Sequence, residues 1–513
     1  MFKPLLRAVA PIALLFSAPV VAQPAAAPIT AADLMRHIER LASDEYQGRA
    51  PGTEGERLTI DYIADELRAR GLEPAGENGG WFQPVRLVER RPGESSVRWT
   101  LNGAALPFEA GDLVLSGSEA SVAVADAPVV FAGHGARLPE RGIDQLAGAT
   151  IDGAVVLILA QGPAVPGFPT ITERMAMVQA AGAAAVIVIA GADLPWETLR
   201  QSGGRRTTQL EATPVPRLSG LMPIAALQRL VAAGGVDMER LLNDQPGSSF
   251  RAVALAIRVS MEAATAVSRY TSNNVIGRLR GSAATNESLL FLAHWDHFGI
   301  CRPEGAPDRI CNGAVDNASG IAAMIEIAGR LARQPRPPRD ILVLATTSEE
   351  VGLLGAEHFA AHPIVPLSSI VAAINMDTVA IHPAGEPVAV MGRGRTALDA
   401  VIDSTVAAMG RRLDTDDEVA AFVRRQDGWK LTQAGVPALM VGGSFSNMAL
   451  LQAFLAGPYH SPEDQIGGRI VLDGAAEDAN LTVELGRRLA DPAVYQRPRA
   501  PAAAAAAENG DEE

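Results

Sequence analysis

Continuous hydrophobic runs in the second half of the chain each lead to a side chain that can bind a metal ion. The runs cover residues 289–292, 341–344 and 370–374. Their length and apolar composition are typical of buried strands. They precede His294, the pair Glu349–Glu350 and Asp377. Because a parallel α/β sheet opens its ligand crevice at the carboxyl ends of its strands, the pattern predicts one site that gathers these side chains.

Helical patterns accompany these runs. A first helix should begin after Thr30, and a second should begin near Gly52–Gly55. A third should cover residues 321–331, where apolar side chains recur at i, i+3, i+4, i+7 and i+10 and face the sheet. The predicted fold class is α/β, with a mixed, mostly parallel sheet flanked by helices.

The chain changes character between about residues 115 and 250, where Ala, Val and Gly dominate alternating strand and turn patterns. We expect a smaller, β-rich α/β domain inserted here, with a generic βαβ element of the main fold as the alternative. The candidate strands are 128–131, 154–159, 184–189 and 215–218, with a helix over 171–181. The main domain would then consist of residues 29–114 and 251–496.

The amino terminus has the pattern of a secretory signal peptide. Lys3 and Arg7 precede an apolar stretch over residues 8–21, and the small residue Ala22 suits cleavage, so the signal peptide would be residues 1–22. No later segment has the roughly twenty uninterrupted apolar residues of a membrane span. We therefore expect export to the periplasm or the extracellular medium. Residues 497–513, rich in Pro, Ala and acids, are expected to be a disordered tail.

Composition excludes one class of partner. The formal net charge is −14 over 513 residues, and no basic stripe with interleaved aromatic residues occurs. Such a chain has no electrostatic route to nucleic acid. The length and the 48% hydrophobic content allow two or three domains with large buried sheets. No sequence feature indicates an oligomeric state.

Five side chains have the chemistry of a site for two metal ions. Imidazole and carboxylate groups are suitable zinc ligands. A carboxylate such as Asp316 has two oxygens and can bridge two ions. The candidate ligands are His294, Asp316, Glu350, Asp377 and His460. This donor set predicts a two-zinc hydrolase.

Five motifs containing these residues resemble, in order and spacing, those of the zinc peptidase family that includes aminopeptidase Y, bacterial leucyl aminopeptidase and glutamate carboxypeptidase. They are 293–297 (AHWDH), 312–320 (NGAVDNASG), 348–355 (SEEVGLLG), 375–377 (NMD) and 459–464 (YHSPED). The middle segment, with Gly153 before a strand and residues 182–189 after a helix, resembles the protease-associated domain that some members carry as an insert. Residues 29–114 and 251–496 would then form the catalytic domain.

The resemblance assigns the ligands to two ions. One zinc would be bound by His294, Asp316 and Asp377, and the second by Asp316, Glu350 and His460. The two ions would share Asp316 and hold a water or hydroxide between them.

The resemblance also implies roles for three further residues. Glu349 would be the general base, because a carboxylate beside the metals can take the proton of the attacking water and pass it to the leaving amine. Asp296 would orient a ligand imidazole. Tyr459 would donate its hydroxyl to the oxyanion of the tetrahedral intermediate.

The function that follows is that of an exported dinuclear zinc aminopeptidase acting on peptides. A carboxypeptidase or dipeptidase of the same scaffold is an alternative, because Arg424, Arg425 and Lys430 offer a basic cluster for a substrate carboxylate. A catalytically silent binding protein is another. Residues 378–434 are expected to form the pocket rim, where Arg425 or Asp427 either touches substrate or lies in a solvated loop.

Three residues close to the predicted ligands complete the expectations. Cys301 and Cys311 lie in one Pro- and Gly-containing loop, and in an oxidising compartment we expect them to form a disulfide worth on the order of 2–3 kcal/mol. Two free thiols are the alternative. His297 is expected to be a structural or rim residue and not a ligand.

Overall fold

The computed structural model describes residues 27–163, 165, 167–233, 237, 250–416, 418–467 and 470–498. The expected signal peptide lies outside these residues, as does residue 499 onward of the expected disordered tail. Arg497, the first residue of that tail, is anchored, because its guanidinium donates hydrogen bonds to the main-chain oxygens of Leu367 at 2.9 Å and Ile370 at 2.7 Å. None of the helices in the described part of the chain is long and apolar enough to cross a membrane.

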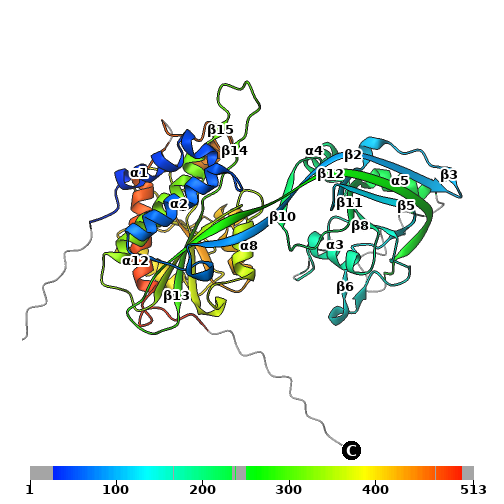
Figure 1. Cartoon of the computed structure of the whole chain (residues 1–513). Coiled ribbons are helices and arrows are strands. Elements are labelled where there is room, and N and C mark those ends of the chain that lie inside the picture. Colours follow the sequence, from blue (N-terminus) through cyan, green and yellow to red (C-terminus); the bar gives the residue numbers. More distant parts are fainter. Residues whose placement is uncertain are drawn as a thin grey trace, which may run out of the picture.

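Two lobes are connected by a pair of long strands (Figure 1). β2 (Phe82–Leu101) and β12 (Val253–Leu279) are antiparallel and paired along most of their length, so they run from one lobe into the other. Their pairing shifts register once, between Ala263 and Thr265. A continuous hydrogen-bonded sheet of 15 strands therefore extends through both lobes.

The first lobe contains the predicted mixed, mostly parallel sheet. β13 (Ser288–His294) is parallel to β16 (Asp340–Thr346) and to β17 (Ile370–Asn375), and β17 is parallel to β19 (Ala438–Gly442). β12 and β18 (Ala389–Met391) flank this parallel core as antiparallel neighbours. The expected strands at 289–292, 341–344 and 370–374 are the centres of β13, β16 and β17, and the α/β fold class is confirmed.

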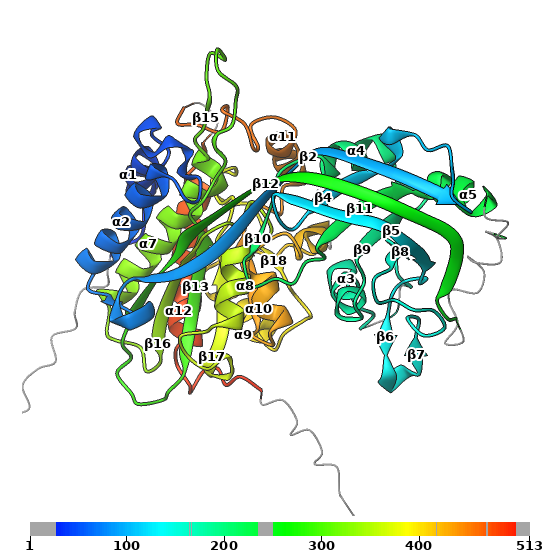
Figure 2. The same cartoon turned by 45° about the vertical axis from the view of Figure 1, so that its right-hand side comes forward.

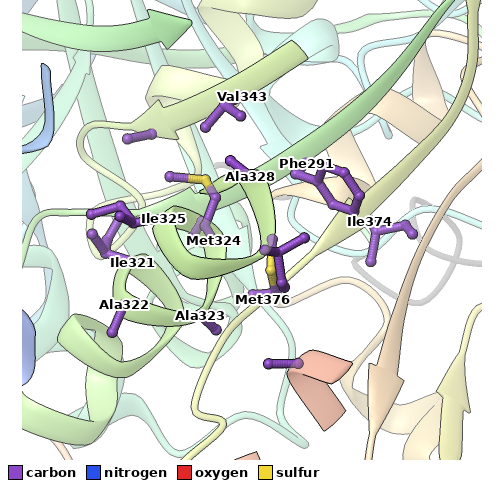
Figure 3. Packing of buried hydrophobic residues seen from close by; sticks show 14 of the residues in the cluster. Phe291, Ile321, Ala322, Ala323, Met324, Ile325, Ala328, Val343, Ile374 and Met376 are labelled. Carbon is purple, nitrogen blue, oxygen red and sulfur yellow. The ribbon is translucent and has the colours of Figure 1, made fainter. Parts of the chain in front are cut away.

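Helices cover both faces of this sheet. On one face lie α1 (Ala31–Leu41), α2 (Glu54–Ala69), α7 (Ser319–Ala332) and α12 (Asp473–Leu489), and on the other α8 (Leu354–Ala361) and α10 (Gly428–Gln433). Alternate residues of β13 point to opposite faces, since Phe291 belongs to the first core and Leu290 to the second. Figure 3 shows Met324 and Ile325 of α7 in the first core with Phe291.

Local signals set the helix starts as expected. Thr30 caps α1, with its hydroxyl accepting the N–H of Asp33 while the Asp33 carboxylate accepts the N–H of Thr30. Thr53 caps α2 through its hydroxyl, which accepts the N–H of Glu56. These caps satisfy main-chain donors that a helix start leaves unpaired.

The second lobe is built on the amino-terminal half of β12 (Figure 2). The strands run in the order β12, β5 (Ser121–Phe131), β8 (Val155–Leu159), β9 (Ala185–Ala190), β11 (Leu218–Pro223) and β4 (Val114–Gly117). β5, β8, β9 and β11 are successively parallel. Three of the expected strands fall in β5, β8 and β9, and the expected helix over 171–181 is α3 (Ile171–Ala180).

The structure differs from the expectations for this lobe in two ways. The expected strand at 215–218 is wrong, because β11 begins at Leu218; Pro214 and Pro216 lack the N–H that a ladder needs. The second core also extends beyond residues 115–250, since it includes Trp99 of β2 and residues 255–263 of β12. The lobes therefore meet within two continuous strands and not at a linker.

Candidate metal centre

The five predicted ligands meet at one edge of the first lobe. His294 is the last residue of β13, Asp377 follows β17 by two residues, and Glu350 follows β16. Asp316 lies in the short turn before α7, and His460 follows α11 (Met448–Leu455). Strand ends thus supply three of the positions, as the hydrophobic pattern predicts.

Asp316 lies between two histidines. His294 Nε2 is 3.3 Å from Asp316 Oδ1 and 3.6 Å from Asp377 Oδ1. On the other side, His460 Nε2 is 3.4 Å from Asp316 Oδ2 and 2.9 Å from Glu350 Oε2. The two oxygens of the Asp316 carboxylate therefore face different histidines, and each histidine also lies near a second acid. A carboxylate shared by two metal ions requires this arrangement.

The donor set fits metal ions. His294 is 1% exposed, and its Nε2 has no hydrogen-bond partner among the described residues although acids surround it. Ligand atoms of His294, Asp316 and Glu350 lie within 4.8 Å of one another, as do those of His294, Glu349 and Asp377. Because buried carboxylates are costly without a counter-charge, such a cluster is suited to cations, and two imidazoles with carboxylates suit zinc.

Glu349 and Glu350 have different surroundings. Burial raises the pKa of Glu349 well above its usual value. Burial also acts to raise the pKa of Glu350, but hydrogen bonds with His297 and His460 bring it below its usual value. Glu350 therefore has the character of an ionised ligand, whereas Glu349 favours holding a proton.

The predicted contact of Asp296 is wrong in detail. His294 Nδ1 lies 3.1 Å from the main-chain oxygen of Asp296, while the nearest carboxylate oxygen of Asp296 is 3.9 Å away. The carboxylate instead accepts the main-chain N–H of Glu349 at 3.0 Å and of Glu350 at 3.4 Å. The imidazole is oriented by a carbonyl, and the side chain of Asp296 holds the glutamate turn.

His297 is buried and does not lie on the rim. It is 1% exposed, and its Nδ1 is 2.5 Å from Glu350 Oε1. The carboxylate of Glu350 thus has one oxygen against His297 and the other against His460. His297 therefore orients Glu350 by contacting the carboxylate oxygen that does not face His460.

Three residues that had no predicted role connect the ligand loops. Arg49 is 1% exposed, and its guanidinium donates to the main-chain oxygens of Leu41 (2.8 Å), Trp295 (2.8 Å), Asn312 (2.5 Å) and Gly313 (2.8 Å). It therefore connects the loop after His294 with the loop before Asp316. No periodic pattern identifies it, although it lies in a Gly-Arg pair beside the second helix start.

Asp464 and Asn317 make the other connections. The Asp464 carboxylate accepts the main-chain N–H of Val315 at 2.9 Å and of Asp316 at 3.0 Å. Asn317 donates to the main-chain oxygen of Met376 at 3.0 Å. Burial raises the pKa of Asp464 to about 6. Asp464 could have been found from the sequence, because it lies in the last of the five motifs, residues 459–464.

Asp427 lies inside the protein and not on the pocket rim. It is 1% exposed, accepts a hydrogen bond from the Thr346 hydroxyl, and has a pKa raised by burial to about 6. Asp427 therefore does not lie in a solvated loop, which was one of the two expected placements. Arg425, by contrast, is exposed and donates to the hydroxyl of Tyr459 at 3.4 Å.

Tyr459 packs directly on a candidate ligand. Its ring is stacked on that of His460, with centroids 3.5 Å apart. Burial raises the pKa of the Tyr459 hydroxyl, and nearby acids such as Asp316 add to this effect, so the phenol stays protonated. It can therefore serve as a hydrogen-bond donor beside the site.

The expected disulfide is present next to this centre. The sulfur atoms of Cys301 and Cys311 are 2.01 Å apart. The bond closes a hairpin of β14 (Gly299–Ile300) and β15 (Ile310–Cys311), which projects from the lobe in Figure 1. It constrains the chain between the His294 and Asp316 loops.

The part of the chain that holds these residues is similar to known proteases. Residues 274–477 match Peptidase family M28. The vacuolar membrane protease of Candida dubliniensis is 34% identical over 97 residues, which are 19% of this chain and 9% of that protein. That of Clavispora lusitaniae is also 34% identical over 97 residues, which are 19% of this chain and 8% of that protein. The chain thus matches less than a tenth of the length of either relative.

A solved structure resembles nearly the whole chain. The aminopeptidase from Aneurinibacillus sp. strain AM-1 aligns with a TM-score of 0.54 and 17% identity, covering 92% of this chain and 97% of that one. At this identity the likeness concerns the fold.

Proposed function

We propose that this chain, whose residues 274–477 match Peptidase family M28, is an exported aminopeptidase with two zinc ions per chain. The observation that carries the proposal is the position of Asp316, whose two oxygens face two separate histidine and acid pairs. A site for a single ion would not need a carboxylate placed in this way.

The chain offers a complete ligand set for each ion. His294, Asp316 and Asp377 would hold the first, and Asp316, Glu350 and His460 the second. Zinc, when bound, polarises the scissile carbonyl and lowers the pKa of water. The protein holds these ligands through Arg49, Asp464, Asn317 and Asp296, so the site is organised by main-chain hydrogen bonds.

Glu349 is positioned to move the proton. Its carboxylate is 3.9 Å from His294 Nε2, so it borders the site while Asp316 and Asp377 lie closer to that nitrogen. It would take a proton from the attacking water and deliver it to the leaving amine. Tyr459, stacked on His460, would donate its hydroxyl to the carbonyl oxygen as negative charge develops there.

An aminopeptidase requires groups for the substrate ammonium and for the first side chain. Glu349 and Asp377 are acids bordering the site and would attract the ammonium. An apolar pocket that Asp377 helps to line would receive the side chain. The basic amino-terminal segment and the disulfide Cys301–Cys311 support export to an oxidising compartment, and the second lobe would be a protease-associated domain.

The test is hydrolysis of matched peptides with free and acetylated amino termini, with chelator and after return of zinc. Cleavage confined to free amino termini, lost with chelator and restored by zinc, is expected. Equal cleavage of acetylated peptides from the carboxyl end would refute the aminopeptidase assignment in favour of a carboxypeptidase.

A further inference from the structure

The pocket beside Asp377 has apolar walls and one basic residue. Its lining comes from the loop after β17, the strands β18 and β19, the segment 422–426 and the region around α11. The apolar members are Met391, Phe422, Met440, Phe445, Leu451, Leu455 and Tyr459. Asp377, Thr378, Gln426 and Arg425 supply the polar groups. The pocket therefore combines an apolar body, an acid of the metal centre and a guanidinium.

Arg425 is held over this pocket. Its guanidinium carbon lies 5.5 Å from the ring centroid of Phe422, and Nη2 donates to the Tyr459 hydroxyl at 3.4 Å. Both contacts are with residues that line the pocket. Within the described part of the chain, no carboxylate comes within 4.0 Å of the Arg425 nitrogens.

The lack of a carboxylate partner is unusual for its surroundings. The chain has 58 acids against 44 basic residues, and the buried carboxylates of Asp296, Asp316, Asp427 and Asp464 lie in or beside the metal centre. The other polar lining group, Gln426, is engaged, since its side-chain oxygen accepts the Asn375 amide at 3.0 Å and the Gly428 N–H at 2.7 Å. Arg425 is thus the charged group of the pocket that is available to an anion.

We propose that Arg425 binds a carboxylate of the substrate at the solvent side of this pocket. The planar guanidinium presents paired N–H donors that match a carboxylate, and its stack on Phe422 orients them. It would also offset the repulsion between an acidic substrate and the acids of the site. This inference rests on the proposed peptidase function and adds the class of substrate to it.

Two sources can supply the carboxylate. It is either the side chain of an acidic amino-terminal residue, whose methylene groups would fill the apolar part, or the terminal carboxylate of a dipeptide. A glutamyl anilide and a glutaminyl anilide differ only in whether the side chain carries a carboxylate. The dipeptide Leu-Gly and its carboxyl-terminal amide differ only in whether the terminal carboxylate is present.

The experiment measures kcat/KM for these four substrates with zinc-loaded full-length enzyme and its Arg425→Met and Arg424→Met variants. Arg424 is a matched control, because it is also exposed and stacks on an aromatic ring, that of Trp429 at 5.4 Å, but does not line the pocket. Arg425→Met should lower the acidic-to-neutral ratio of one pair by roughly tenfold to a hundredfold, the effect of a hydrogen bond to a charged group. Arg424→Met should leave both ratios unchanged.

The outcomes distinguish a failure of the Arg425 role from a failure of the peptidase function. A lower glutamyl-to-glutaminyl ratio identifies the side-chain carboxylate, and a lower ratio for the Leu-Gly pair identifies the terminal one. If the wild type cleaves these substrates and neither ratio changes in Arg425→Met, the role of Arg425 is refuted while the peptidase function stands. If the zinc-loaded wild type cleaves none of them, the proposed function fails and this inference with it.

Discussion

Glu349 and Glu350 are neighbours in the chain but meet different partners. Glu350 contacts His460 at 2.9 Å and His297 at 2.5 Å, whereas Glu349 lies 3.9 Å from His294. Asp296 holds the turn between them by accepting both main-chain N–H groups. Two identical side chains thus have different surroundings because the backbone directs them apart, and the proposed function gives them separate roles.

Substitution should separate these roles. Glu349→Gln keeps the size of the side chain but removes the proton acceptor, so we expect kcat to fall by roughly 10²- to 10⁴-fold. The zinc content, measured by elemental analysis, should stay near two per chain. Loss of both ions from this variant would show that Glu349 is a ligand and not the base.

Asp316→Ala is the matching control, because it removes the carboxylate that faces both histidines. Its zinc content should fall sharply. Retention of two ions by Asp316→Ala would contradict the shared-ligand assignment.

Arg49 acts at the scale of elements. It lies beyond α1 in the chain, yet its donors reach main-chain oxygens at Trp295, Asn312 and Gly313, roughly 250 residues away in sequence. Burial lowers the pKa of Arg49 to about 10, so it remains charged at neutral pH. One buried cation therefore satisfies carbonyls from two ligand loops at once.

Removing this cation should loosen both loops. Arg49→Met leaves several buried acceptors unpaired, so we expect a loss of more than about 3 kcal/mol in unfolding free energy and weaker zinc binding. Thermal unfolding and zinc titration against a competing chelator would measure both. Arg57→Met, on the exposed side of α2, is the control and should change neither. Unchanged zinc affinity in a folded Arg49→Met protein would contradict the positioning role.

A buried ionic network connects three helices away from the site. The carboxylate of Glu326 in α7 lies 2.6 Å from Arg70, the residue that follows α2. It also lies 2.9 Å from Arg36 and 3.1 Å from His37, both in α1. Burial would raise the pKa of Glu326, but its hydrogen bonds with His37 and Arg70 bring it to about 2. Its ionised form therefore stabilises the folded state above the usual value of 4.5, and this stabilisation disappears as the pH falls toward 2.

Glu326→Gln should therefore lower the unfolding free energy at neutral pH by roughly 3 kcal/mol, because Arg36, His37 and Arg70 lose their most buried carboxylate and keep the more exposed Glu66 as a partner. It should also flatten the pH dependence of stability between pH 4.5 and 2, which denaturant unfolding across that range would measure. Glu54→Gln removes an acid from an exposed pair with Arg57 and should have little effect. An unchanged slope in Glu326→Gln would show that Glu326 titrates normally.

The sequence predicts those elements whose signals are local. Thr30 and Thr53 cap their helices through residues three positions away, and the apolar run before His294 forms a buried strand on its own pattern. The candidate ligands could be chosen because strand ends meet at one sheet edge. The contacts of Asp296 and Arg49 could not be predicted, since each depends on where a distant main-chain segment passes. For the same reason the lobe boundary within β2 and β12 left no compositional signal.

At the scale of the whole molecule, each lobe has its own core. Trp99 packs in the second lobe with Phe131 and Leu255, whereas Phe291 and Ile325 pack in the first. The lobes share the β2–β12 ribbon, in which Arg91 is paired with Ala266. The candidate metal ligands lie in the first lobe, so we expect the second lobe not to be needed to assemble the metal centre.

Replacing residues 92–265 by an Asn-Gly turn would join the strands at this pair with a two-residue hairpin. We expect the shortened chain to fold, to bind two zinc ions and to hydrolyse a leucyl anilide, measured by circular dichroism, elemental analysis and absorbance. Trp99→Ala in the full chain also tests whether the metal centre is independent of the second lobe, with a smaller change to the protein. It should lower the unfolding free energy of the second core by roughly 3–5 kcal/mol and leave the zinc content unchanged. Zinc loss from Trp99→Ala would show that the ribbon couples the second core to the metal centre, and the second lobe would then be part of the catalytic unit.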